Sequence, residues 1–294
     1  MKLAVFGKRI EATQIAEFNQ LFRKLKKINC EVLIYSELAE EAKQHKDLEP
    51  LEWATFSTHK DLDKEIDFLI SLGGDGTFLN TILLIRDLDI PVLGINTGRL
   101  GFLSNTPTSE IDWAIDCLVS GRYSTEKRNM LSLESESKLF GDDNLALNEI
   151  SLLKRDSASM IIIHVELNGL HLNSYWTDGL IISTATGSTA YSLSCGGPIL
   201  MPGSGNFVIT PIAPHNLNVR PIVIADDSVL KLKVESRSDT SLVALDSRSK
   251  ELANDEVLIV QKAQHSLSIV QLEEHSFIQS LRHKLNWGLD KRNS

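Results

Sequence analysis

The stretch Phe68-Leu69-Ile70-Ser71-Leu72-Gly73-Gly74-Asp75-Gly76-Thr77 decides the fold of the first half of the chain. It joins an apolar run to a glycine-rich turn, and a helical pattern follows from Thr77 to Arg86. Further apolar runs without polar alternation occur at residues 3–6, 32–35 and 92–95. Because helical patterns separate these runs, the sequence predicts an α/β domain with a parallel sheet that is covered on both faces.

The glycine-rich turn has the features of a phosphate-binding loop, with one exception. Glycines let backbone N–H groups approach a phosphate, and the N-terminus of the following helix adds a favourable dipole. Asp75 is the exception, because a carboxylate repels phosphate. Its presence points to a chemical role, such as accepting a proton from a hydroxyl nucleophile or helping to hold a divalent metal ion. The alternative is that Asp75 only caps the helix.

The pattern changes to alternation of apolar and polar residues in the second half of the chain. Residues 160–167 and 170–172 form two such runs, and Asn168-Gly169 between them is typical of a type I′ hairpin turn. More strand-like runs follow, separated by Pro, Asp and Ser. This half therefore predicts an all-β domain, an antiparallel β-sandwich.

The chain of 294 residues is long enough for about two domains of roughly 150 residues each. We expect an α/β domain at 1–125 and a β-sandwich domain at 126–272. A helical pattern at 273–294 predicts a C-terminal tail that packs back on an earlier part of the chain.

Composition and charge exclude several function classes. Hydrophobic residues make up 42% of the chain and charged residues 23%, which is typical of a soluble globular protein. The net charge of −9 argues against a nucleic-acid or membrane-surface partner. Three scattered cysteines without a CxxC pair and eight histidines without ligand spacing predict a reducing compartment and no metal site made by the protein alone. No apolar run reaches the roughly 18 residues of a membrane span, so we expect a cytoplasmic protein.

Hydroxyl side chains crowd into one segment of the second half. They are Ser183, Thr184, Thr186, Ser188, Thr189, Ser192 and Ser194. Small polar side chains and glycines can form a hydrogen-bonding wall for a polyhydroxy or phosphorylated ligand. A serine nucleophile is less favoured, because the pattern Gly-x-Ser-x-Gly is absent. The alternative is a loop without a function.

Taken together and in this order, several motifs resemble the NAD kinase family. They are Gly73–Thr77, Leu93–Leu103, Asn148-Glu149, Asp178-Gly179 and Thr186–Pro198. Gly-Gly-Asp-Gly also occurs in diacylglycerol kinases, sphingosine kinases and phosphofructokinases, whereas the Asn-Glu pair and the run Thr-Gly-Ser-Thr-Ala-Tyr-Ser-Leu-Ser are more specific. The resemblance implies a Rossmann-like N-terminal domain, a β-sandwich C-terminal domain, NAD bound between them, and a homo-oligomer, either a dimer or a tetramer.

The resemblance also implies roles for particular residues. Asp75 corresponds to the proton acceptor, and Gly76 is its neighbour in the NAD contact. Asn148 and Glu149 match a pair that binds the ribose on the nicotinamide side and, with a metal ion, the phosphoryl donor; taken alone, this pair is equally typical of the end of a hairpin. The other positions that match the family's NAD-binding residues are Phe102, Asp178, Thr186, Thr189, Ala190, Tyr191, Ser192, Leu193 and Ser194.

The chain departs from the family pattern at four positions. Trp176 stands where several relatives have a basic residue, Asn80 where His or Arg is frequent, Arg248 where glutamine is common, and Ala185 where most have proline. Trp176 has two interpretations. Its indole either stacks against the bound nucleotide or lies in the core of the sandwich, since tryptophan is usually well buried.

The resemblance implies transfer of the γ-phosphoryl group of ATP to the adenosine ribose 2′-hydroxyl of NAD, which gives NADP and ADP. Mg²⁺ would arrive with ATP, held largely by phosphate oxygens and one or two carboxylates. Two alternatives are a lipid kinase of the diacylglycerol or sphingosine type, which would need an apolar or basic membrane face, and a non-catalytic nucleotide-binding regulator. The sequence does not decide between NAD and NADH, or between ATP and polyphosphate.

Overall fold

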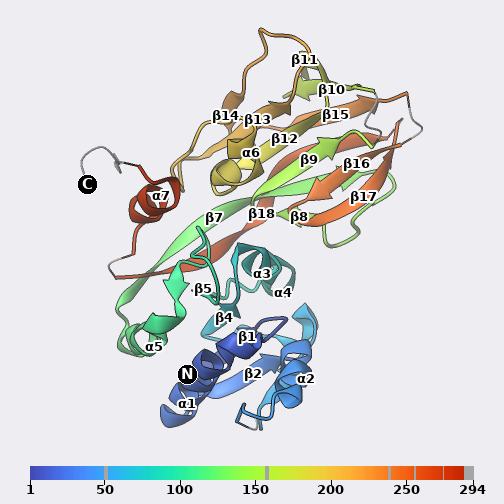
Figure 1. The fold of residues 1–294 in the computed structure, drawn as a ribbon. Coiled ribbons are helices and arrows are strands. Elements are labelled where there is room, and N and C mark those ends of the chain that lie inside the picture. Colours follow the sequence, from blue (N-terminus) through green and yellow to red (C-terminus); the bar gives the residue numbers. More distant parts are fainter. Residues whose placement is uncertain (50–51, 156–158, 238–239, 255, 274, 288–294) are drawn as a thin grey trace. The chain divides into compact units, whose positions relative to one another are not determined.

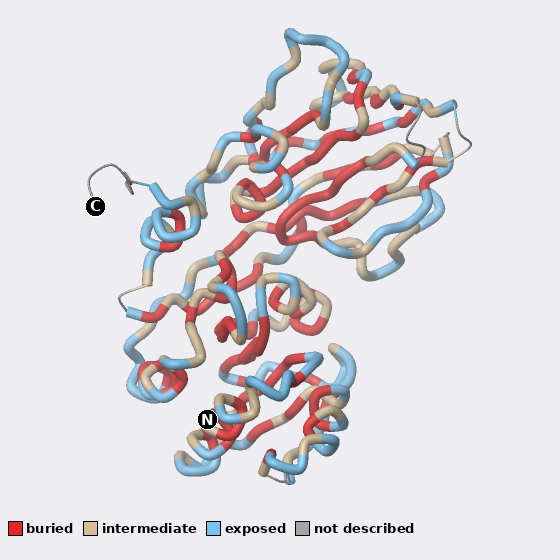
Figure 2. The backbone as a smooth tube through the Cα atoms, in the orientation of Figure 1, coloured by how far each residue is buried: buried red, intermediate tan, exposed pale blue. Residues whose placement is uncertain are grey.

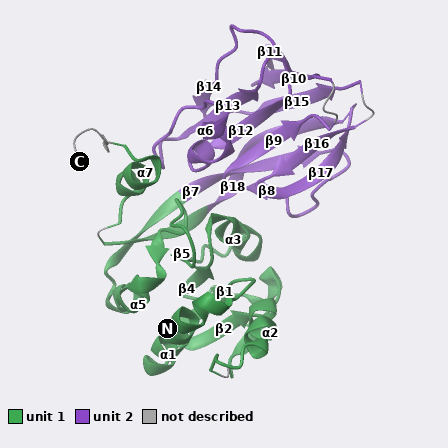
Figure 3. Ribbon diagram, viewed as in Figure 1, with its two compact units in different colours: residues 1–127, 267–294 green, residues 128–266 purple. Residues whose placement is uncertain are grey.

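The computed structural model divides the chain into two compact units (Figure 3). It describes residues 1–294 except 50–51, 156–158, 238–239, 255, 274 and 288–294. Unit 1 comprises residues 1–127 and 267–294, and unit 2 comprises residues 128–266. Residues 267–272, which the sequence interpretation places in the second domain, are therefore grouped with the first unit.

Unit 1 contains a parallel sheet in the order β18-β5-β4-β1-β2-β3, with the short strand β6 beside β5 (Figure 1). Its strands are β1 (Lys2–Phe6), β2 (Glu31–Tyr35), β3 (Ala54–Phe56), β4 (Phe68–Leu72), β5 (Val92–Asn96), β6 (Thr106–Pro107) and the last part of β18 (Val257–Leu272). Read from β3 to β5, the order 3-2-1-4-5 is that of a Rossmann-like domain, and the predicted fold class is confirmed.

The helices of unit 1 follow the pattern that the sequence predicts, with local differences. They are α1 (Ile15–Lys27), α2 (Ser36–Gln44), α3 (Asp75–Leu79), α4 (Thr81–Ile85), α5 (Ile111–Ser120) and α7 (Phe277–Leu285). The helix expected from Thr77 to Arg86 begins at Asp75 and is interrupted at Asn80, which ends α3 and precedes α4. Helix α7 lies within the predicted helical tail, whose residues 274 and 288–294 lie outside the described part of the chain.

Alternate residues of the central strands face opposite sides of the sheet, and both faces are covered. Leu3, Ile70 and Ile95 belong to a core cluster that includes residues of α1 and α5. On the other face, a Cβ atom added to Gly94 would lie 3.0 Å from the ring of Phe78, which is in α3. Because both faces are buried, these strands need no polar alternation, as the apolar runs in the sequence indicate (Figure 2).

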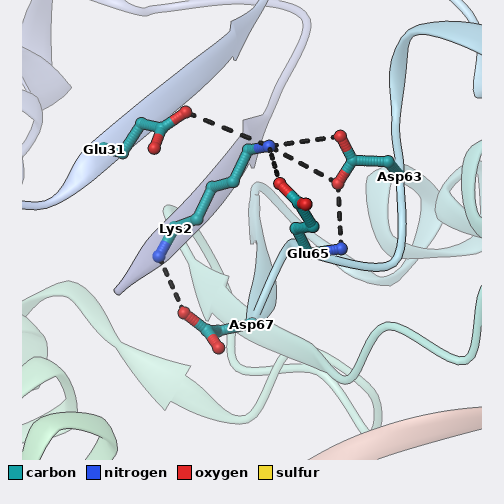
Figure 4. Close-up of polar contacts among 5 residues, drawn as sticks. All are labelled: Lys2, Glu31, Asp63, Glu65 and Asp67. Atoms are coloured by element: carbon teal, nitrogen blue, oxygen red, sulfur yellow. Dashed lines mark hydrogen bonds and ion pairs between the residues drawn. The ribbon is translucent and has the colours of Figure 1, made fainter.

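The amino ends of the unit 1 strands are held together by Lys2 (Figure 4). Its backbone N–H donates a hydrogen bond of 2.7 Å to Asp67. Its ammonium Nζ lies 3.1 Å from a carboxylate oxygen of Asp63, 3.5 Å from Glu65 and 3.9 Å from Glu31. A hydrogen bond from the backbone N–H of Glu65 keeps the pKa of Asp63 below its ordinary value, and the hydrogen bond from Lys2 adds a smaller effect in the same direction. This edge of the sheet is occupied by structural charge pairs.

The glycine-rich turn lies at the opposite end of the sheet, where the strands have their carboxyl ends. In this strand order the direction of the chain connections reverses between β1 and β4, and ligands of such sheets bind outside the carboxyl ends of the strands at this switch point. Gly7 follows β1, and Gly73 and Gly74 follow β4. The fold therefore places the predicted loop at the edge where a ligand is expected.

Unit 2 is built from two sets of antiparallel strands. One sheet has the order β14-β13-β12-β9-β16-β17, and the other set contains β11-β10-β15-β18 and the pair β7-β8. The strands are β7 (Tyr123–Ser135), β8 (Leu145–Ala146), β9 (Glu149–Leu153), β10 (Ile161–Leu167), β11 (Leu170–Thr177), β12 (Gly179–Thr184), β13 (Asn206–Ile212), β14 (Ile222–Ala225), β15 (Leu230–Glu235), β16 (Thr240–Leu245) and β17 (Arg248–Ala253), and the short helix is α6 (Tyr191–Ser194).

A single core lies between the two sets of strands in unit 2. Ile163 of β10 and Leu232 of β15 belong to the same buried cluster as Ile182 of β12. The predicted turn between β10 and β11 is present, with positive φ of 52° at Asn168 and 80° at Gly169, as a type I′ turn requires. The expectation of a β-sandwich is confirmed.

Among the described residues, no helix is both long enough and apolar enough to cross a membrane.

Candidate active site

The carboxylate of Asp75 is held by the backbone of another loop. Its Oδ2 accepts a hydrogen bond of 2.8 Å from the N–H of Phe102, and its Oδ1 accepts bonds of 3.0 and 2.9 Å from Leu103 and Ser104. Asp75 begins α3, but its side chain points to this loop and makes no cap of its own helix. The interpretation of Asp75 as a simple helix cap is therefore wrong.

Gly101 makes this arrangement possible, because it lies directly against the carboxylate. A Cβ atom at Gly101 would stand only 1.8 Å from Oδ1 of Asp75 and 2.6 Å from its Cγ. Both distances are far below van der Waals contact, so no other amino acid fits here without moving Asp75. Gly101 therefore allows the close approach of the Asp75 side chain rather than that of a phosphate.

Helix α7 brings a cation to the same place in unit 1. The Nζ atom of Lys284 lies 3.9 Å from Oδ2 of Asp75 and 4.5 Å from the centre of the Phe102 ring. Phe277, at the start of the helix, lies beside Phe102 with ring centres 6.1 Å apart. The sequence interpretation did not foresee this contact, since the helical pattern of the tail predicts packing but not a partner.

In unit 2, Asn148 and Glu149 lie where the chain passes from one set of strands to the other. Strand β8 pairs with β7, whereas β9, which begins at Glu149, pairs with β12 and β16. Asn148 and Glu149 do not end a hairpin, and the hairpin interpretation of this pair is wrong. A Cβ atom on Gly187 would lie 2.1 Å from the carbonyl oxygen of Asn148, so the hydroxyl-rich segment packs directly against the pair.

Asp246 fixes the segment in which the chain passes from one set of strands to the other. The sequence interpretation assigned this residue no role. Its carboxylate accepts hydrogen bonds of 2.9, 2.8 and 3.1 Å from the backbone N–H groups of Leu147, Asn148 and Glu149. Asp246 has a positive φ of 52° in the turn between β16 and β17. An Asp-Ser dipeptide between two strand-like runs is a turn signal, but it does not predict which backbone the carboxylate binds.

Glu149 is buried and one of its oxygens lacks a partner. The residue is 9% exposed, and Oε2 has no hydrogen-bond partner. Burial, with a smaller contribution from the charge of Asp246, raises the pKa of Glu149 to about 8, although a hydrogen bond from the Tyr191 backbone lowers it in part. A buried carboxylate with a free oxygen fits a divalent cation or a hydroxyl group of a ligand.

Most hydroxyl groups of the predicted wall bond to the protein itself. Ser188 Oγ donates to the carbonyl of Ala185 at 2.7 Å, and Ser192 Oγ lies 2.8 Å from Oγ1 of Thr210. Thr184 donates to the carbonyl of Leu147 at 2.6 Å. These three hydroxyls shape the segment. Ser194 is an exposed member of the wall, and Tyr191, which lies in the same segment, is also exposed. Contacts of the segment with a nucleotide stay a prediction.

The remaining predicted positions are placed as follows. Asp178 lies between β11 and β12, and its Oδ1 is 2.7 Å from Nζ of Lys154. Trp176 is 50% exposed on β11, so its interpretation as a core residue is wrong, whereas stacking on a nucleotide stays a prediction. Asn80 donates a bond of 2.7 Å to the carbonyl of Gly76. The guanidinium of Arg248 binds the backbone carbonyls of Asp143 and Leu145, which is a structural role.

Comparison with known proteins assigns the chain to a family. Residues 3–123 match the N-terminal domain of ATP-NAD kinases, and residues 147–272 match their C-terminal domain. A protein named NAD kinase from Flavobacterium psychrophilum is 46% identical over the full length of both chains, and one from Cytophaga hutchinsonii is 44% identical, also over the full length of both. The chain belongs to the NAD kinase family.

Solved structures of the NAD kinase family share the fold. A yeast NADH kinase crystallised with NADH has a TM-score of 0.86 at 23% identity, with 100% of this chain and 89% of that chain covered. An NAD kinase from Archaeoglobus fulgidus in complex with ATP has a TM-score of 0.76 at 24% identity, with 97% and 99% covered. Family membership makes the chain a phosphotransferase, and neither the lipid kinase nor the non-catalytic alternative is favoured.

We predict that Gly101→Ala removes at least about 99% of the NAD kinase activity. The added methyl group overlaps Asp75, for which the family resemblance implies a catalytic role, and displacing such a group costs about 10²-fold or more. The matched control is Gly98→Ala in the same loop, where the nearest atom to a Cβ would be 3.8 Å away. Steady-state rates with melting temperatures check this. Normal activity of Gly101→Ala would contradict the proposed dependence on the position of Asp75.

We predict that Glu149→Gln flattens the dependence of stability on pH. The pKa of Glu149 rises on folding from 4.5 to about 8. Its contribution to the free energy of unfolding is therefore fully present below about pH 4.5 and is lost as the pH rises through about 8. The loss between about pH 6 and about pH 8 is roughly 2 kcal/mol. Calorimetry of wild type, Glu149→Gln and the control Glu166→Gln, at a glutamate whose side chain is 40% exposed, measures the slopes. Equal slopes for all three would contradict the assignment.

Proposed function

We propose that this chain transfers the γ-phosphoryl group of ATP to the adenosine ribose 2′-hydroxyl of NAD, with Asp75 as proton acceptor. The observation that carries the proposal is the binding of the Asp75 carboxylate by three backbone N–H groups. An ionised carboxylate offers about four lone-pair positions. Three are used by the loop, which leaves one to accept a hydrogen bond from the substrate hydroxyl.

The reaction then balances without a covalent enzyme intermediate. The 2′-hydroxyl loses its proton to Asp75 while its oxygen forms a bond to the γ-phosphorus. The bond from that phosphorus to the oxygen bridging the β- and γ-phosphates breaks, and ADP leaves with that electron pair. The fixed position of Asp75 supplies orientation, which is the main protein contribution to phosphoryl transfer beside charge stabilisation.

Unit 2 supplies the residues that we propose bind NAD and the metal ion. The site includes Asn148 and Glu149, with Asp178 and the segment from Thr186 to Ser194. Mg²⁺ bound with ATP would neutralise charge on the phosphates. The fit of Glu149 to the ion rests on its buried carboxylate and unpartnered Oε2, and the described residues contain no group of three or more His, Cys, Asp or Glu side chains that could hold a metal ion.

Two expectations about the protein stay predictions. Assembly into a dimer or tetramer follows from the family resemblance, and the molar mass in solution from light scattering measures it. A cytoplasmic location follows from composition and cysteine use.

We predict that the purified protein forms NADP from NAD only when both ATP and a divalent cation are present. The measurement is a coupled assay in which an NADP-specific dehydrogenase reports the product, with parallel reactions that contain NADH, polyphosphate or diacylglycerol. EDTA should abolish the activity, and an excess of Mg²⁺ should restore it. Turnover after complete removal of metal, or phosphorylation of diacylglycerol in place of NAD, would overturn the proposal.

We predict that Asp75→Asn lowers kcat by about 10²- to 10⁴-fold, because the variant keeps the size of the side chain but removes the proton acceptor. This loss corresponds to roughly 3 to 5 kcal/mol of activation free energy. The affinity for NAD should change far less. Asp116→Asn, on the exposed face of α5 where Asp116 pairs with Lys24, is the matched control. Near-normal turnover of Asp75→Asn would return the residue to a structural role.

A further inference from the structure

The helix α7 presents one lysine to the proposed catalytic carboxylate. Lys284 lies in the last turn of the helix, and its side chain is 29% exposed. Its Nζ atom is 3.9 Å from Oδ2 of Asp75, which is too long for a hydrogen bond but short enough for strong electrostatic attraction. The ammonium group is therefore close to the carboxylate without being committed to it.

The ring of Phe102 lies against this ammonium group, and a second ring packs beside Phe102. Nζ lies over the ring of Phe102 at 4.5 Å from its centre, within the range of a cation–π interaction. Phe277 packs beside Phe102 and anchors the first turn of α7. Because the backbone N–H of Phe102 also binds Asp75, the carboxylate, the ring and the ammonium group form one connected unit.

The proposed reaction creates negative charge at this position. Before transfer, the substrate hydroxyl beside Asp75 is neutral. After transfer, a phosphate monoester with about two negative charges occupies its place. A phosphate next to a carboxylate is strongly disfavoured unless a cation lies near both, because like charges at this distance repel each other.

We propose that Lys284 is the cation that binds the phosphoryl group once the 2′-hydroxyl has accepted it, as the 2′-phosphate of NADP. This inference rests on the proposed function, and it adds a specificity-determining residue from the C-terminal helix. An ammonium group has three N–H donors, so it can bind the phosphate while it stays near Asp75. The lysine then contributes to the transition state and the product, and little to the binding of NAD.

Direct binding tests the assignment independently of turnover. Isothermal titration with NADP and with NAD, in the absence of ATP, compares two ligands that differ only by the 2′-phosphate. We expect Lys284→Met to raise the Kd for NADP about tenfold or more, because a charge-assisted contact is lost, while the Kd for NAD changes less than about threefold. In the coupled assay, kcat should fall about tenfold with a nearly unchanged KM for NAD.

Two further variants separate a phosphate contact from a structural role of the helix. Arg282→Met removes a neighbouring cation of the same helix turn and should bind NADP as the wild type does. Lys284→Arg keeps the charge and should retain most of the NADP affinity. Equal weakening of NAD and NADP binding in Lys284→Met would show a structural role, and unchanged NADP binding would show no contact; either result overturns the inference.

The failure of this inference is distinguishable from failure of the proposed function. If the wild type forms no NADP from NAD and ATP, the proposed function fails whatever the binding data show. If the wild type turns over normally and Lys284→Met retains wild-type NADP affinity, only the assignment of Lys284 fails.

Discussion

The structure of the proposed catalytic centre depends on one interaction, the binding of the Asp75 carboxylate by consecutive N–H groups of Phe102, Leu103 and Ser104. Hydrogen bonds to a charged acceptor are shorter and stronger than neutral ones. They join the first residue of α3 to the loop after β5, and they require a glycine at position 101. The orientation of the proposed base is thus fixed by two adjacent parallel strands rather than by a flexible side chain.

Unit 2 uses the same device at the other proposed binding region. The carboxylate of Asp246 accepts hydrogen bonds from three consecutive backbone N–H groups, those of Leu147, Asn148 and Glu149. The interaction fixes the chain where it passes between the two sets of strands. It also places a second carboxylate near Glu149, and burial together with this charge accounts for the raised pKa of Glu149. A structural hydrogen-bond requirement therefore adds to the effect of burial on the pKa of a residue that we propose binds substrate and metal.

The sequence predicts the architecture because the architecture follows from local patterns. Buried parallel strands appear as unbroken apolar runs, and the hairpin at Asn168 and Gly169 follows from the left-handed backbone that its turn requires. Family motifs indicate Asp75 and the pair Asn148-Glu149, and the structure gives each a defined environment.

The partners of these residues are not predictable in the same way. Asp246 lies 98 positions from Asn148 along the chain, and Lys284 reaches Asp75 only because a tail helix packs on the sheet domain. Both are ordinary charged residues in sequence, since neither stands in a pattern whose spacing depends on its partner. The exposure of Trp176 is a further case, because tryptophan content alone does not say which strands lie at the edge of a sheet. Contacts between distant segments carry most of the information that local periodicity lacks.

The division of unit 1 into two separate segments has a consequence for the order in which the protein is made. The last part of β18 pairs with β5, and α7 lies beside Phe102, yet the ribosome synthesises both only after all of unit 2. The nascent α/β unit therefore lacks an edge strand and the helix beside Asp75 throughout the translation of the inserted domain. An emerging chain can form the loop that binds Asp75 early, but the neighbouring Lys284 arrives among the last residues described.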